Sequence, residues 1–146
     1  MNNDYLGTPA DTIAIANAIA RAEGFFTKGT IPQVHNNPGD IENAHGQKMV
    51  FATESDGWDA LYRQIELMIT GRSRIYKPTM TWIQIGSYYD GEKLFMDWVS
   101  NVTKVLGVEP SSTLGEFIAN FGKPKATPIG LTFEDTVDFA DKVNNG

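Results

Sequence analysis

Glu23 is the acidic residue whose position in this sequence best suits proton transfer. It ends an alanine-rich segment with apolar residues at helical spacing, and Gly24 follows it directly as a helix stop. The partial negative charge of a helix C-terminus disfavours a carboxylate, and apolar neighbours such as Ile19, Phe25 and Phe26 disfavour it further through desolvation. Both effects predict a raised pKa, as a general acid needs near neutral pH. The alternative interpretation is an ordinary surface glutamate at a helix end.

Other kinds of chemistry have little support in the sequence. The two histidines, His35 and His45, show no HExxH or similar ligand spacing, and the chain has no cysteine. No GxSxG elbow is present, so a serine nucleophile of that type is not indicated. We therefore expect no metal and no cofactor.

The spacing of apolar residues and capping signals predicts a succession of helices that would hold Glu23 in place. They cover about residues 9–23, 55–71, 78–86, 91–106, 113–121 and 132–143. Trp58, Trp82 and Trp98 fall on apolar faces of these helices, so we assign them to the core. Residues 25–53 are instead rich in turn formers and predict a loop with a small two- or three-stranded sheet. The expected fold class is α+β, mainly α, with a small β lobe after the first helix.

Length and charge reduce the number of function classes that fit the sequence. The 146 residues fit a single domain spanning 1–146, with an N-terminal tail at 1–8. The net charge of -6 argues against nucleic acid as a partner. No apolar run approaches the roughly 20 residues that cross a bilayer, so we expect no membrane insertion. The first residues lack a basic and an apolar region, which predicts no signal peptide.

Several segments together resemble the lysozyme-like superfamily. The stretch Ile19–Phe25 resembles the helix end that carries the catalytic glutamate there, immediately before a β lobe. The resemblance covers about residues 10–108 and is to phage or prophage domains of the lytic transglycosylase type, with residues 109–146 outside it. The other segments that carry it are NNPGDI (36–41), Gly46, the expected strand 51–53, DGWDALYRQI (56–65) and the corner Tyr88-Tyr89-Asp90-Gly91.

This resemblance implies a lysozyme-like fold and cleavage of the β-1,4 bond between N-acetylmuramic acid and N-acetylglucosamine, with Glu23 as the acid. The chain departs from the pattern at Gly24, where lytic transglycosylases usually have serine. It also departs at Ile31 and Pro32, where two-carboxylate phage lysozymes have an aspartate. Asp40 is the first acid after Glu23 and is the candidate second carboxylate of an inverting hydrolase. In the alternative mechanism the substrate's N-acetyl group assists and Glu23 acts alone, which the spacing slightly favours.

Side chains in the expected loops are candidate contacts for the sugar. Amides bond hydroxyl and acetamido groups, and aromatic rings stack on pyranose faces. The alternative interpretation of Asn-Asn-Pro-Gly is a simple turn. The candidate substrate-binding residues are Phe26, Asn36, Asn37, Thr53, Tyr88 and Tyr89.

Two other classes of function remain open. One is a non-catalytic relative, a virion or secretion-apparatus component that binds glycan or a protein neighbour, and the acidic pI favours it. The other is a chitin-type glycosidase. The expected partners are peptidoglycan glycan strands and other phage virion proteins. We expect the protein in the virion or the host cytoplasm, with delivery to the wall by another route. The basic run 71–77 is either a solvated loop or a contact for a muropeptide carboxylate.

Overall fold

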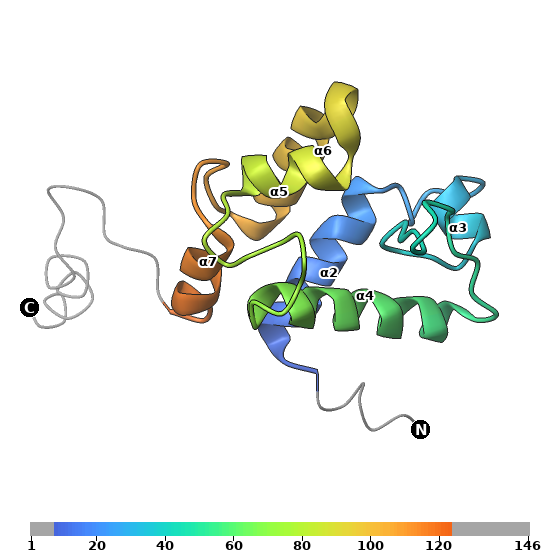
Figure 1. Ribbon diagram of the computed structural model, residues 1–146, viewed down its shortest axis with the longest axis horizontal. Helices are drawn as coiled ribbons and strands as arrows, with labels where there is room; N and C mark the ends of the chain where they lie inside the picture. The colour runs from blue at the N-terminus through green and yellow to red at the C-terminus, as the bar shows by residue number, and fades with distance from the viewer. Residues whose placement is uncertain (1–7, 124–146) are drawn as a thin grey trace, which may run out of the picture.

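The alanine-rich helix α2 (Ala10–Ala22) lies at the centre of the arrangement, as Figure 1 shows. The computed structural model describes residues 8–123. Helix α2 packs against α4 (Glu54–Ile69) and α6 (Gly91–Leu106), α5 (Trp82–Tyr89) packs on α6, and α7 (Leu114–Asn120) contacts α4. The small side chains of α2 allow close approach, since Ala16, Ala18 and Ala20 are fully buried. Among the described helices, none combines the length and the apolar character needed to cross a membrane.

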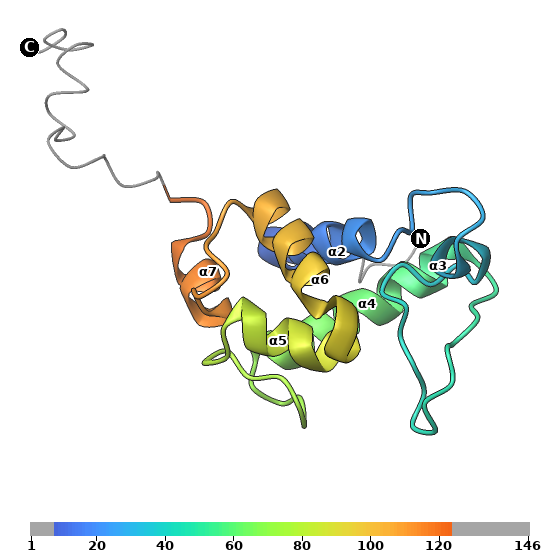
Figure 2. The ribbon, with the colours of Figure 1, turned by 90° about the horizontal axis from the view of Figure 1, so that it is seen from above.

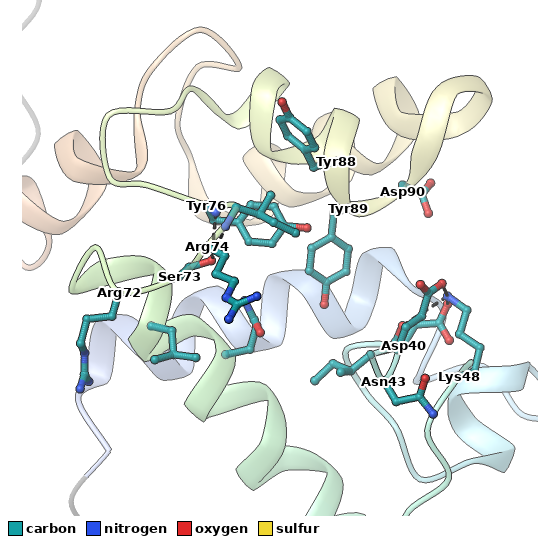
Figure 3. A pocket seen from close by; sticks show the side chains of 15 residues that line it. Asp40, Asn43, Lys48, Arg72, Ser73, Arg74, Tyr76, Tyr88, Tyr89 and Asp90 are labelled. Carbon is teal, nitrogen blue, oxygen red and sulfur yellow. Dashed lines mark hydrogen bonds and ion pairs between the residues drawn. The ribbon is translucent and has the colours of Figure 1, made fainter. Parts of the chain in front are cut away.

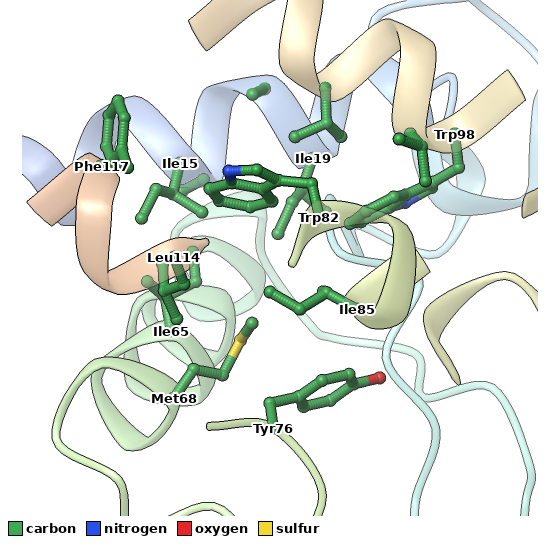
Figure 4. Packing of buried hydrophobic residues seen from close by; sticks show 14 of the residues in the cluster. Ile15, Ile19, Ile65, Met68, Tyr76, Trp82, Ile85, Trp98, Leu114 and Phe117 are labelled. Atoms are coloured by element: carbon green, nitrogen blue, oxygen red, sulfur yellow. The ribbon is translucent and has the colours of Figure 1, made fainter. Parts of the chain in front are cut away.

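The apolar core lies between these helices (Figure 4). The predicted core positions of Trp82 and Trp98 are confirmed, because both are almost fully buried. Trp58 is only partly buried at the edge of the core, and its Nε1 donates to Glu54 Oε2 at 3.1 Å. Other large side chains of the core are Ile15, Ile19, Leu61, Ile65, Met68, Ile85, Val99, Val102 and Leu114.

The predicted mainly helical character is observed, but the bounds of α5 differ from the prediction. The helix begins after a capping box between Thr81 and Gln84 and ends at Tyr89, four residues later than expected at its start and three later at its end. Gly86 lies inside the helix instead of ending it. A Cβ at this position would lie 2.4 Å from Val99 Cγ2, so the glycine serves the contact between α5 and α6. The predicted helix at 132–143 lies outside the described residues.

Residues 24–53 form a lobe beside the C-terminal end of α2, and its hairpin projects from the helices in Figure 2. The lobe contains a short helix, α3 (Ile31–Val34). In place of the predicted sheet, this segment has an isolated antiparallel bridge between Glu42 and Lys48. The buried Asn37 amide bonds the Ile41 and Met49 carbonyls, at 3.0 and 2.9 Å. The Met49 N–H also donates to the Ile41 carbonyl at 2.9 Å, but the backbone pairing does not extend from the bridge into strands. The prediction of a β lobe is therefore corrected to a loop with one bridge, which the Asn37 amide supports.

The lobe contacts α4 most closely at Gly57. A Cβ on Gly57 would lie 1.8 Å from the carbonyl oxygen of Asn36 and 2.8 Å from Pro38 Cδ. The backbone of the lobe therefore passes directly over the helix at this point. This contact fixes the path of the chain that leads to Asp40.

We expect Gly57→Ala to destabilise the protein by about 1–3 kcal/mol, because backbone atoms would have to move away from the added methyl group. Without that contact the change would stabilise the helix by roughly 0.5–1 kcal/mol, so the sign of the effect is diagnostic. Urea unfolding at equilibrium measures it, and Ser55→Ala at an exposed position of the same helix is the control. A Gly57→Ala variant as stable as the wild type would contradict the close approach.

Candidate active site

Glu23 follows the last residue of α2 and stays close to the helix axis. Its backbone is helical, with φ -82° and ψ -6°, and its N–H donates to the Ile19 carbonyl at 2.8 Å. Gly24 then has a φ of 83°, a left-handed conformation that glycine adopts without strain, and the chain turns into the lobe. The Glu23 carboxylate thereby points back toward α6, where Trp98 Nε1 donates to Oε2 at 2.8 Å. The predicted helix end is confirmed at this residue.

Burial and two neighbouring negative charges hold a proton on Glu23. Burial is the largest cause, followed by the charges of Asp90 and Asp40, and together they raise the pKa of Glu23 to about 8. The hydrogen bond from Trp98 and the positive charge of Lys48 lower this pKa but do not outweigh the burial. The sequence predicted a raised pKa from apolar neighbours. The two carboxylates were not part of that prediction.

Asp40 lies where the lobe turns toward the cleft, and its backbone has a φ of 49°. Its Oδ2 pairs with Lys48 Nζ at 2.8 Å, while its Oδ1 is buried without a hydrogen-bond partner in the described residues. Lys48 also pairs with Glu42 at 3.2 Å. Burial lowers the pKa of Lys48, but its hydrogen bonds to the two carboxylates outweigh burial and raise that pKa overall. The positive charge of Lys48 is therefore shared between the carboxylates of Asp40 and Glu42.

Aromatic rings form the wall between α2 and the cleft. Tyr89 stacks on Trp98 with ring centroids 5.0 Å apart, and its hydroxyl donates to the Gly39 carbonyl at 2.6 Å. Tyr76 packs against Tyr89 at 6.1 Å. Burial, together with the negative charge of Glu23, raises the pKa of Tyr76 to about 12 and that of Tyr89 well above its usual range. Both phenols therefore remain neutral hydrogen-bonding groups at physiological pH.

A cleft of about 820 Å³ runs along this wall, as Figure 3 shows. Asp40 and Asp90 lie toward one end and arginines lie toward the other. Glu23 does not line this cleft itself, but its charge interacts with the two aspartates that do. Burial, with a smaller effect of Asp40, raises the pKa of Asp90. The residues that line the cleft are Asp40, Ile41, Glu42, Asn43, Lys48, Gln64, Leu67, Arg72, Ser73, Arg74, Ile75, Tyr76, Tyr88, Tyr89 and Asp90.

Asp40, Tyr88 and Tyr89 are the predicted site residues that line the cleft, and Glu23 stands next to them. Tyr88 is well exposed, at 65%, and is therefore accessible to a ligand. Tyr89 has its hydroxyl bonded to the Gly39 carbonyl and its ring packed against Trp98 and Tyr76, so it shapes the wall of the cleft.

The other predicted contacts have structural partners. Asn37 is fully buried and its amide bonds the lobe backbone, which removes it from contact with any substrate and corrects its predicted role. Asn36 Nδ2 donates to the Phe51 carbonyl, and Thr53 caps α4 by accepting from the Asp56 N–H. These two hydrogen bonds belong to the scaffold of the lobe.

Phe26 does not line the cleft. Its ring is 53% exposed, it packs against Phe25 and Trp58, and Arg21 lies over it at 5.3 Å. The structure therefore does not bring it together with the cleft residues.

Four residues that matter here were not predicted as site residues: Trp98, Asp90, Lys48 and Tyr76. Trp98 was assigned to the core on its helical spacing, and a pattern of apolar positions carries no sign of a hydrogen bond across two helices. Asp90 adjoins the Tyr88-Tyr89 pair, which was the available signal for it. Lys48 meets Asp40 and Glu42 by ion pairs within the lobe, and Tyr76 meets the site by packing against Tyr89.

Comparisons with known proteins add no family assignment to this geometry, because no family model, curated protein or solved structure matches the chain. Within residues 8–123, no group of three or more His, Cys, Asp or Glu side chains is arranged to hold a metal ion. The site is therefore interpreted from its own acid–base chemistry.

The pKa of Glu23 should respond with opposite signs to changes at two of its neighbours. Trp98→Phe removes the N–H donor that stabilises the carboxylate, so we expect the pKa of Glu23 to rise. Asp90→Asn removes a negative charge, so we expect it to fall. Carbon-detected NMR titration of the side-chain carboxyl group measures both shifts.

Trp82→Phe is the matched control for this titration. Trp82 is also a buried core indole, but its Nε1 has no hydrogen-bond partner among the described residues. The control should lose packing without moving the pKa of Glu23 upward as Trp98→Phe does. Equal shifts in the two tryptophan variants would contradict a specific role for the hydrogen bond.

Protonation of Glu23 should make stability depend on pH. Its pKa is about 8 in the folded protein and 4.5 in a reference peptide, so the folded state binds more protons between these values. Stability therefore falls as pH rises through this window, by roughly 1.4 kcal/mol for each unit of the difference at most. We expect Glu23→Gln to match the wild type near pH 4 and to exceed it by a few kcal/mol at pH 9. Urea unfolding across this range measures the effect, with Glu66→Gln on the exposed face of α4 as the control.

Proposed function

We propose that this domain cleaves the β-1,4 bond between N-acetylmuramic acid and N-acetylglucosamine in peptidoglycan, on a lysozyme-like scaffold. The observation that carries the proposal is the half-buried Glu23, whose pKa is raised to about 8 beside the acidic end of an open cleft. A carboxyl group that keeps its proton at neutral pH is suited to protonating a leaving oxygen. The tyrosine-lined wall and the cleft volume of about 820 Å³ support the binding of a glycan strand.

In the proposed reaction Glu23 donates its proton to the glycosidic oxygen as the bond to the anomeric carbon breaks. The departing sugar leaves as an alcohol, and positive charge develops on the ring that remains. The negative charges of Asp40 and Asp90 then favour this cationic transition state electrostatically. After the transfer Glu23 is an anion, and Trp98 Nε1 is already in place to stabilise it.

The second step has two forms. In a hydrolase, Asp40 would activate a water molecule, but its Oδ1 is buried and would have to become accessible for that role. In a transglycosylase-type reaction, an oxygen within the substrate attacks the anomeric carbon, and Glu23 takes back a proton. The pairing of Asp40 with Lys48 at 2.8 Å supports the second form, because the lysine competes with any water for the carboxylate.

Purified peptidoglycan tests the catalytic assignment directly. We expect Glu23→Gln to reduce the release of muropeptides by roughly 10²- to 10⁴-fold, because the amide keeps the shape and cannot supply the proton. The wild-type rate should fall as pH rises above about 8, where Glu23 ionises. Mass spectrometry of the products distinguishes anhydro-muropeptides, which indicate transglycosylation, from the reducing ends that hydrolysis leaves.

Two further results would reject the assignment. A wild-type protein that releases no muropeptides, or a Glu23→Gln variant that releases them equally well, rules out this acid. The first outcome would leave a binding role in a larger assembly, and the second would leave cleavage that depends on another residue.

Asp40→Asn separates the two forms of the second step. If Asp40 is the base, turnover should fall by a factor similar to that of Glu23→Gln. If the substrate assists itself, turnover should persist, and the alkaline limb of activity should shift to lower pH because one charge that raises the pKa of Glu23 is gone. A pH–rate profile of each variant measures both effects.

A further inference from the structure

The cleft has a basic end that the proposed chemistry does not use. Arg72 and Arg74, on the loop after α4, line the cleft on one side of Tyr89, whereas Asp40 and Asp90 line it on the other (Figure 3). Three of the twelve basic residues of the chain lie in this short loop, and it contains no acid. The two ends of the cleft therefore differ in the sign of their charge.

The backbone of this loop is held in place by its own side chains. Lys77 Nζ donates to the carbonyls of Gly71 and Ser73, at 2.9 and 2.5 Å. Ser73 Oγ accepts from the N–H groups of Ile75 and Tyr76, at 3.1 and 3.0 Å. Lys77 is thus used within the loop, and the two arginines extend from a braced backbone, which reduces the entropy lost when they bind a ligand.

The guanidinium groups of Arg72 and Arg74 retain N–H donors that can bind a ligand. Neither Arg72 nor Arg74 forms an ion pair with a carboxylate among the side chains that the structure describes. Arg72 uses its Nε in a 3.0 Å hydrogen bond to Thr70 Oγ1, and its terminal nitrogens remain. A guanidinium presents its donors in a fork that matches the two oxygens of a carboxylate.

The charge pattern of the cleft restricts its ligand. A polyanion would be repelled at the end formed by Asp40, Glu42 and Asp90, in a chain of net charge -6. An uncharged chitin strand would leave the arginines without a partner. A glycan that is neutral along its sugar rings and carries a carboxylate on a side branch fits both ends.

We propose that Arg74, with Arg72 on the same loop, binds a carboxylate carried by the muramic acid of a peptidoglycan strand. The domain would thereby prefer muramyl glycans to chitin. The identity of the glycan rests on the proposed function. The carboxylate has two possible sources on the same sugar, namely the free lactyl group or the stem peptide attached to it.

Binding to soluble oligomers tests the inference without relying on cleavage. Glu23→Gln is the background, and calorimetry compares intact muropeptide strands, strands stripped of peptide by an amidase, and chitotetraose. We expect Arg72→Gln with Arg74→Gln to weaken binding of at least one muramyl ligand about tenfold and to leave chitotetraose unchanged. Arg63→Gln, exposed on α4 outside the cleft, is the matched control, and Arg74→Lys should restore part of the affinity. The loss should shrink as salt is added.

The ligands distinguish the source of the carboxylate. A loss on intact strands alone assigns the site to the stem peptide, and a loss on stripped strands alone assigns it to the lactyl group. Unchanged binding of both muramyl ligands overturns the inference. An equal loss on chitotetraose also overturns it, because that result indicates a sugar contact or general damage.

The same data separate this inference from the proposed function. If the wild type cleaves nothing but arginine-dependent binding is found, the proposed cleavage fails and the carboxylate site stands. If the wild type cleaves peptidoglycan and the arginine variants bind both muramyl ligands normally, cleavage stands and the carboxylate site fails.

Discussion

The hydrogen bond between Trp98 Nε1 and Glu23 Oε2 joins the end of α2 to the buried face of α6. The same indole belongs to the core and stacks on Tyr89, whose hydroxyl bonds the Gly39 carbonyl in the lobe. One ring therefore links three parts of the structure: the central helix, the wall of the cleft and the loop that leads to Asp40. A group held this firmly is positioned before any ligand arrives, which is the condition for efficient acid catalysis.

Electrostatics adds a second constraint around the same carboxyl group. Glu23, Asp40 and Asp90 lie close enough for their charges to interact, and Lys48 pairs with Asp40. Adding a negative charge to Glu23 is unfavourable in this half-buried group, so the proton stays on Glu23. The aspartates are nearer the open cleft and Glu23 stands behind them. Their charges thus act on the acid and on any cation that develops in the cleft.

The sequence predicted the parts of this arrangement that depend on local signals. The apolar period and Gly24 located the end of α2, and the apolar environment of Glu23 predicted its raised pKa. The structure adds the parts that depend on contacts distant in sequence. Trp98 lies 75 residues from Glu23, and nothing in its helical spacing distinguishes an indole that packs from one that also donates a hydrogen bond.

The lobe shows why the turn signals of the sequence predicted its structure only in part. Asn-Asn-Pro-Gly was open to two interpretations, a ligand contact or a turn, and both asparagine amides bond the backbone of the lobe. Short apolar stretches suggested strands, but the backbone pairing is limited to the bridge between Glu42 and Lys48, and the Asn37 amide supports it by bonding the Ile41 and Met49 carbonyls. A buried amide can support a loop in this way only when the fold brings carbonyls from other parts of the chain within hydrogen-bond distance. The sequence around Asn37 does not reveal which carbonyls its amide will bond.

The contacts of Asp40 indicate whether the proposed reaction needs Asp40 for proton transfer or only Glu23. Asp40 has a defined electrostatic role through its effect on Glu23, and its Oδ2 is bound to Lys48. That role requires a charge near Glu23 and does not require proton transfer by Asp40. Both protonation states of Glu23, by contrast, are stabilised. Burial favours its protonated form, and Trp98 stabilises its anion. A residue supported in both protonation states can act first as an acid and then as a base, so the single-glutamate scheme needs fewer assumptions.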